Sequence, residues 1–198
     1  MKPSLAIERL LSKYANVGDF VHDGIRFKTN VPRIAPQAYL HILFPPAQPA
    51  VLKQRAEELR IPPALCDFYS QWNGACLFAG VLAIYGLLPD QYRFNRSDWR
   101  CQLPFNLIAE SRRWRTELDH RNLLCFGSYS QDRSPLCISR DSGAVTAFAA
   151  DRLDRVRATW PDFEVFLAAE LERLAAFFDE HGGCIFPGEA LLPSQPVG

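Results

Sequence analysis

The residues of this chain that could carry out chemistry are few and lie far apart in the sequence. His181 and Cys184 form the closest pair of metal-ligating residue types, and no second pair lies near them. A structural zinc site needs about four such ligands, brought together by short spacings. His22, His41 and His120 are isolated from one another. The sequence therefore predicts no metal site and no cofactor.

Two common catalytic motifs are missing as well. The segment Gly127-Ser128-Tyr129-Ser130 does not fit the Gly-x-Ser-x-Gly turn that exposes a nucleophilic serine. Gly74, Gly80 and Gly86 are separated by bulky apolar residues and do not form the Gly-x-Gly-x-x-Gly loop of nucleotide sites. Because the sequence carries no catalytic signature, we predict that the protein is not an enzyme.

Aromatic and arginine side chains gather in the irregular segment 90–101, which contains Tyr92, Phe94 and Trp99. Such side chains on a loop are typical of the residues that dominate protein–protein interfaces. The alternative is that they fold back and cover an edge of the sheet. Together with Tyr129 and Asp132, which begin a turn between two predicted strands, they form the predicted partner-binding set.

Charge is balanced over the whole chain but unevenly distributed. Residues 1–60 contain nine Lys or Arg against five Asp or Glu, and residues 131–198 contain six against eleven. A net charge of zero argues against nucleic-acid binding, which needs a basic excess. The basic cluster Arg112-Arg113-Trp114-Arg115 is interpreted as a solvated helix face. The acidic C-terminal third is either a solvated helix face or a docking surface for a basic partner.

Composition indicates an ordinary globular protein: 48% of the residues are hydrophobic and 22% are charged. No apolar run reaches the roughly 18 residues of a membrane-spanning helix, and the N-terminus does not resemble a signal peptide. The cysteines lack Cys-x-x-Cys spacing, and several lie in apolar runs, so free buried thiols in a reducing cytoplasm are expected. They are Cys66, Cys76, Cys101, Cys125, Cys137 and Cys184.

The pattern of apolar residues predicts helices that precede and follow a run of antiparallel strands, which is an α+β fold. Helices are expected near residues 5–14, 49–59, 63–72, 103–118 and 163–178. The last is expected to expose Glu164, Glu170, Glu172, Asp179 and Glu180. Strands are expected in a hairpin around Asp23-Gly24 and at residues 39–44, 76–79, 81–87, 123–129, 135–139 and 144–149.

Three blocks in this order resemble the SUKH superfamily. The first is Ile61 to Pro89, with Leu65, Phe68-Tyr69, Asn73-Gly74 and Ile84-Tyr85-Gly86-Leu87. The second is the apolar segment Leu123–Tyr129 followed by Asp132, and the third is the aromatic and acidic start of the last helix, Trp160–Leu167. The resemblance extends from about residue 49 to residue 178.

The SUKH superfamily includes bacterial immunity proteins and a fungal regulator of cell-wall synthesis. The resemblance implies a single, mostly antiparallel α+β domain over residues 49–181, with an N-terminal helix and hairpin (1–48) packed on it and a loose tail (182–198). It implies a cytoplasmic protein that sequesters a cognate bacterial toxin. The alternatives are a scaffold or regulator of the same fold, and a small-molecule-binding domain or enzyme whose site is not visible in the sequence.

Overall fold

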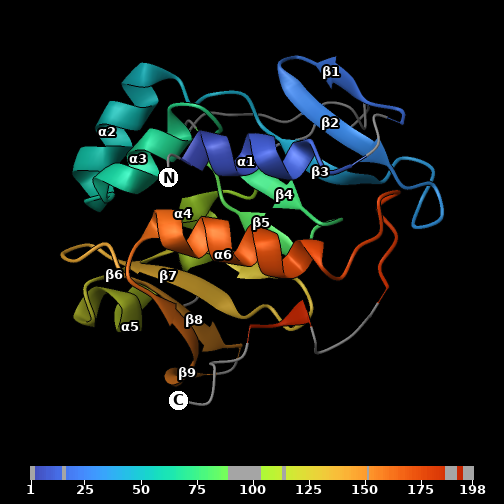
Figure 1. Ribbon diagram of the computed structural model, residues 1–198. Coiled ribbons are helices and arrows are strands. Elements are labelled where there is room, and N and C mark those ends of the chain that lie inside the picture. The colour runs from blue at the N-terminus through green and yellow to red at the C-terminus, as the bar shows by residue number, and fades with distance from the viewer. Residues whose placement is uncertain are drawn as a thin grey trace.

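The computed structural model describes residues 3–14, 17–88, 104–112, 115–150, 152–185 and 191–193, with the backbone alone at 3, 4 and 115–117 (Figure 1). The helices are α1 (Pro3–Leu11), α2 (Pro49–Leu59), α3 (Pro63–Tyr69), α4 (Leu107–Ser111), α5 (Arg115–His120) and α6 (Phe163–Ala175). The strands are β1 (Phe20–His22), β2 (Ile25–Asn30), β3 (Tyr39–Leu43), β4 (Ala75–Leu77), β5 (Leu82–Ile84), β6 (Leu123–Tyr129), β7 (Pro135–Ser139), β8 (Val145–Ala149) and β9 (Arg152–Trp160).

The strands form one sheet in which the spatial order is the chain order, from β1 at one edge to β9 at the other. Every neighbouring pair is antiparallel. The α+β fold with a mostly antiparallel sheet is confirmed. Because β3 pairs with β4, the N-terminal residues contribute strands to the same sheet as the rest of the chain.

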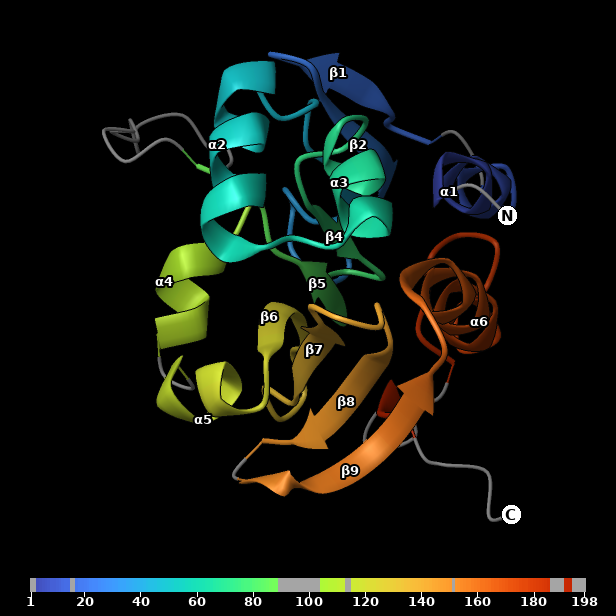
Figure 2. The same cartoon turned by 90° about the vertical axis from the view of Figure 1, so that its left-hand side faces the viewer.

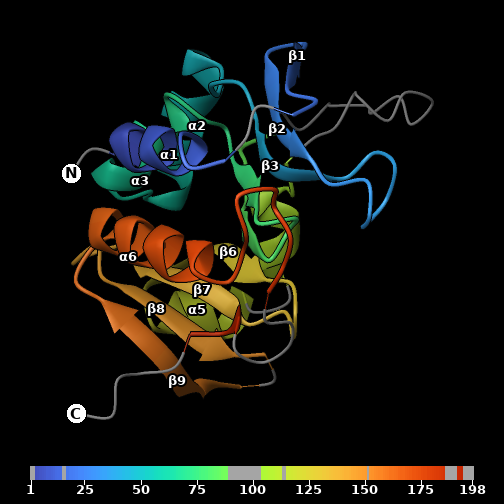
Figure 3. The same ribbon diagram turned by 45° about the vertical axis from the view of Figure 1, so that its right-hand side comes forward.

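Helices cover both faces of this sheet. Helices α1 and α6 pack against each other and α3 contacts both, whereas α4 and α5 pack on β6. Figure 2 shows α1 and α6 on one side of the strands and α4 and α5 on the other. Figure 3 shows the group of α1, α3 and α6 from another side. The central strands are therefore enclosed, and β6 lies between the two helical layers.

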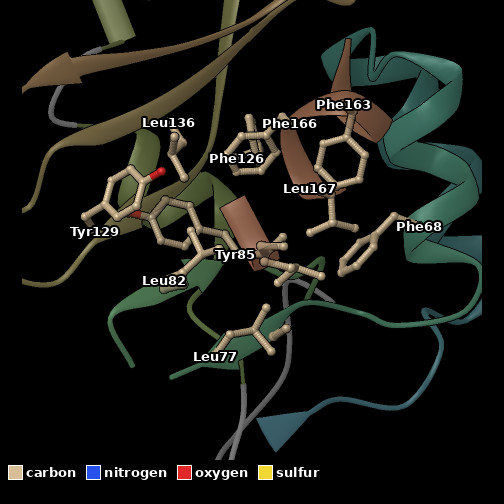
Figure 4. Close-up of a cluster of buried hydrophobic side chains, with 14 of the residues drawn as sticks. Phe68, Leu77, Leu82, Tyr85, Phe126, Tyr129, Leu136, Phe163, Phe166 and Leu167 are labelled. Atoms are coloured by element: carbon tan, nitrogen blue, oxygen red, sulfur yellow. The ribbon is translucent and has the colours of Figure 1, made fainter. Parts of the chain in front are cut away.

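The centre of the core is a group of aromatic rings from α3, β6 and α6 (Figure 4). The Phe163 ring lies 5.5 Å from the rings of Phe68 and Phe126, and Phe126 lies 5.5 Å from Phe166, all edge to face. All four side chains are fully buried. Since aromatic pairs in this geometry add to the gain from burial, they bind the three elements together.

Asp162 and Gly127 fix local structure around this core. The Asp162 carboxylate accepts a hydrogen bond of 2.7 Å from the Val165 N–H and so caps the start of α6. On β6, a side chain at Gly127 would lie 2.4 Å from the Ala83 carbonyl oxygen on β5. Glycine is therefore required there for the two strands to approach.

The longest strand, β9, was not predicted from the sequence. Arg152–Trp160 carries Arg152, Asp154, Arg155 and Arg157 with few apolar residues. An edge strand needs little apolar surface, because one of its sides has no neighbouring strand, and charged residues there are common. The alternation of Val156, Ala158 and Trp160 was the weak signal that could have revealed it.

The single helix predicted over residues 103–118 is also wrong, because this region contains the two short helices α4 and α5. Asn106 begins α4, since its side-chain oxygen accepts hydrogen bonds from the N–H groups of Ile108 and Ala109 at 2.9 and 3.2 Å. The apolar pattern continues through both helices and therefore does not mark the break.

The C-terminal segment is held to the domain wherever it is described, and the predicted loose tail is wrong for those residues. The Ile185 N–H donates to the Phe177 carbonyl at 2.8 Å, and Gly182 packs on Val31 and Leu40. Leu191 and Leu192 are buried. Figure 3 shows the chain after α6 turning back beside the strands.

A fully buried histidine, His41 on β3, lies between the rings of Tyr14 and Phe78. Its Nδ1 accepts a 3.3 Å hydrogen bond from the Phe78 N–H, so Nε2 carries the proton of the neutral ring. Burial, and to a smaller extent the charge of Lys28, lowers the pKa of His41 from 6.5 to about 3. The folded protein thus keeps His41 neutral in a pH range where the unfolded chain protonates it.

This difference predicts a loss of stability in mild acid. As the pH falls below 6.5, the unfolded state binds a proton that the folded state does not, so the free energy of unfolding decreases by about 1.4 kcal/mol per pH unit. The effect is isolated by urea unfolding of the wild type and of His41→Gln, each at pH 7 and at pH 5. The carboxylates titrate in both proteins, so their contribution cancels when the two losses of stability are compared. We expect the wild type to lose about 2 kcal/mol more than the variant. Equal losses would show that His41 is not held neutral.

Candidate functional site

Of the predicted partner-binding residues, the structure describes Tyr129 and Asp132. Tyr92, Phe94 and Trp99 lie outside the described residues. Tyr129, at the end of β6, is fully buried. Asp132 is partly exposed, but its carboxylate is engaged by Ser134 of its own turn and by Arg157 on β9. Burial thus argues against Tyr129 as a surface contact and makes it a core residue.

Tyr129 belongs to a buried polar network that includes Glu170 on α6. Its hydroxyl donates to Glu170 Oε2 at 2.7 Å, and the Arg173 guanidinium donates to both carboxylate oxygens at 2.7 and 2.9 Å. Arg173 also donates to the Leu191 carbonyl at 2.9 Å. Burial, then the charge of Glu170, raises the pKa of Tyr129 well above its ordinary value. The network joins β6, α6 and the C-terminal segment.

Glu170 was predicted to lie on the exposed face of the last helix, and this prediction is wrong. The residue is only 2% exposed. Its position in the apolar stripe of α6, beside Phe166, Leu167 and Leu171, was the available signal. Buried carboxylates are rare unless they are paired, which favours the surface for a glutamate. Arg173 lies at i+3 on the same helix and is visible as a partner in the sequence, whereas Tyr129, 41 positions earlier, is not.

Asp132 organises the turn between β6 and β7 and links it to β9. Its carboxylate accepts hydrogen bonds from the Ser134 N–H at 2.8 Å and from the Ser134 hydroxyl at 2.9 Å. It also pairs with Arg157 at 2.6 Å. These contacts fix the turn, so the residue has a structural role beside any role in binding.

A polar cavity of about 460 Å³, which we call the α4 groove, lies among the described residues. It is lined by residues from the C-terminal end of α2, from α4 and α5, from the start of β6 and from the end of β7. Figure 2 shows the ribbons of α2, α4 and α5 on the left. Its apolar wall contains Leu107, Ile108, Leu118, Leu123 and Leu124. A cavity of this size and mixed lining is in the range of small-molecule sites.

Charged groups from three distant parts of the sequence surround this wall, namely Arg60, Arg112 and Arg140 with Glu58 and Asp119. The Arg140 side chain is 13% exposed and donates to the Leu59 carbonyl at 3.0 Å and to Asp119 at 3.4 Å. It therefore joins α2, α5 and β7 and holds one side of the groove in place.

Arg60 and Arg112 are at the exposed rim. The Arg60 guanidinium reaches Asp141 at 3.2 Å and Asn122 at 3.3 Å, and the Arg60 and Asp141 side chains are both mostly exposed. Arg112 follows α4, is exposed, and has no hydrogen bond or ion pair from its side chain to any of the described residues. The rim thus offers guanidinium groups that a ligand could bind.

Other chemistry finds little support in the part of the chain that the structure describes. No three residues of the His, Cys, Asp and Glu types lie close enough there to hold a metal ion. Burial raises the pKa of the thiols of Cys66, Cys76 and Cys137, that of Cys76 to about 12. These thiols stay protonated at neutral pH and are poor nucleophiles. None of the described helices has the length and apolar character needed to cross a membrane.

A comparison with protein-family models matched residues 46–169 to the SMI1 / KNR4 family (SUKH-1). The chain belongs to this family. The match confirms the SUKH resemblance found in the sequence, and it begins before α2 and ends within α6. A search of curated protein sequences found no match.

The α4 groove lies inside the SUKH-1 region, because all of its lining residues fall between Glu58 and Arg140. Arg112 belongs to the basic cluster that the sequence made visible. Arg60 and Arg140 were not singled out, because they are isolated arginines whose proximity depends on the fold. No spacing rule connects three residues that lie at the end of a helix, after a second helix and at the end of a strand.

Proposed function

We propose that this SUKH-1 protein binds a cognate toxin domain and neutralises it. The observation that carries the proposal is the family match over residues 46–169, since the SUKH superfamily includes bacterial immunity proteins. Neutralisation by an immunity protein is a protein–protein association that masks the toxin, and it needs a surface rather than a catalytic site.

The charges at the surface support binding of this kind. The exposed guanidinium groups of Arg60 and Arg112 and the exposed carboxylates of Glu172 and Glu180 lie on different elements. Complementary charge on a partner accelerates encounter and fixes orientation. Tyr92, Phe94 and Trp99 remain proposed contacts on the grounds of their residue types alone.

The test is co-expression with the C-terminal domain of a large protein encoded next to this gene. A host that expresses the domain alone should stop growing, growth should return when this chain is co-expressed, and the two should purify as one complex. An unrelated immunity protein is the control. A toxic domain that this chain neither rescues nor binds would contradict the proposal, and a complex without rescue would favour a regulatory role instead.

A further inference from the structure

The geometry of the α4 groove points to a binding site for a small organic anion that carries a carboxylate on an apolar body. This inference goes beyond the proposed function and does not depend on it. It rests on the size of the groove, on its apolar wall and on the state of each charged group around it.

The volume of the groove and its apolar wall indicate the size and the apolar character of the ligand. About 460 Å³ accommodates a molecule of roughly a dozen or more non-hydrogen atoms. Leucine and isoleucine side chains from α4, α5 and β6 form one side. The Ser111 hydroxyl lies close to the backbone carbonyls of Leu107 and Cys125, at 2.5 and 3.0 Å, and is occupied by them. This side of the groove therefore selects for an aliphatic or aromatic group.

The carboxylates of the groove are already neutralised by arginines of the protein. Glu58 pairs at 2.5 Å with Arg55, whose side chain is only 6% exposed. Asp119 pairs with Arg140, which is held on its other side by the Leu59 carbonyl. A cationic ligand would have to compete with these fixed partners, so the acidic residues do not make the groove a cation site.

Arg112 has no partner among the described residues, so its positive charge is not compensated there. Arg60 is paired with Asp141 at 3.2 Å, but both side chains are mostly exposed, where an ion pair contributes little and a ligand carboxylate could compete for the guanidinium. Guanidinium groups bind carboxylates with two parallel hydrogen bonds, which gives both strength and direction. An anion held at the rim by Arg112 and Arg60 would direct its apolar body toward the leucine wall.

The backbone at Arg60 is consistent with a need for its side chain. Arg60 ends α2 in the left-handed conformation, with φ of 54°. Glycine is preferred at such a position because it avoids a steric cost of roughly 1–2 kcal/mol. The contacts of the Arg60 guanidinium with Asn122 and Asp141 are ones that glycine could not make.

The experiment titrates 4-phenylbutyrate into the ¹⁵N-labelled full chain and follows the backbone amide signals by NMR. We expect saturable shifts at Ser111, Asn122 and Leu124, with a dissociation constant on the order of 1 mM or tighter. The matched probes 4-phenylbutan-1-ol and 4-phenylbutylamine lack the negative charge, and acetate lacks the apolar body. All three should bind at least about tenfold more weakly.

Two variants connect the binding to the groove. Arg112→Gln should weaken the binding of 4-phenylbutyrate about tenfold, which is the usual effect of losing a charged hydrogen bond. It should leave folding unchanged, because the side chain has no partner in the described structure. Arg155→Gln on β9 is the control, since it removes the same charge from an exposed site outside the groove.

The proposal is overturned if no amide signal moves up to the solubility limit of the probe, or if the signals that move belong to residues away from the groove. It is equally overturned if the alcohol binds as tightly as the carboxylate, or if both variants weaken binding to the same extent. None of these outcomes bears on toxin neutralisation, which is measured by growth and complex formation, and failure of that test leaves the groove proposal intact.

Discussion

Replacing Glu170 by alanine is expected to lower the free energy of unfolding by about 3–5 kcal/mol, as found when one partner of a buried ion pair is removed. The substitution would leave the Tyr129 hydroxyl without its acceptor inside the core. It would also leave the half-buried Arg173 without the carboxylate that binds it through two nitrogens. Equilibrium urea denaturation, followed by tryptophan fluorescence, measures the loss.

Glu172→Ala is the matched control, because Glu172 is exposed on the same helix two residues away. It should change stability by less than about 0.5 kcal/mol. If Glu170→Ala does not fold, Tyr129→Phe provides a milder test, since it removes one hydrogen bond of the network and should cost about 1–2 kcal/mol. A Glu170→Ala protein as stable as Glu172→Ala would contradict the assignment of Glu170 as the centre of a stabilising network.

Replacing Phe163 by alanine should also cost about 3–5 kcal/mol, the usual effect of truncating a buried aromatic side chain. The Phe163 ring contacts Phe68 and Phe126 in edge-to-face geometry and is fully buried between α3, β6 and α6. Its removal leaves a cavity where three elements meet. Small domains have only about 5–15 kcal/mol of stability. The midpoints of thermal and urea unfolding should therefore fall strongly.

Val165→Ala is the control for the Phe163 variant, since Val165 lies on the same helix and is 44% exposed. Its effect should stay within about 0.5 kcal/mol. Phe163→Leu keeps most of the side-chain volume and should lose much less stability than Phe163→Ala. This comparison separates the cost of the cavity from any loss of the helix. Equal stability of the alanine and leucine variants would argue against close packing at this point.

Much of the fold was predictable from the sequence, because local patterns determine local elements. The short apolar segments within residues 123–149 predicted β6, β7 and β8, and the stripe Phe163, Phe166, Leu167 predicted α6. Strand β9 was missed because an edge strand need not be apolar. The break between α4 and α5 was missed because the apolar period continues across it.

The functional surface was much less predictable, because it depends on contacts between residues distant in sequence. Tyr129 followed an apolar strand and resembled a turn residue, yet a hydrogen bond to Glu170, 41 positions later, places it in the core. Arg60 and Arg140 are isolated basic residues until the fold places both at one groove. Spacing rules detect sites built from one segment, and this groove is assembled from five elements.

The strictly sequential order of the sheet has a consequence for how this protein can evolve. Every connection joins two strands that are already neighbours, so a connection can change in length or composition without altering which strands pair. The long connection from β5 to β6, which includes α4 and α5, can therefore diverge while the nine-stranded scaffold keeps its register. Sequence changes in such a connection therefore carry little risk to the fold.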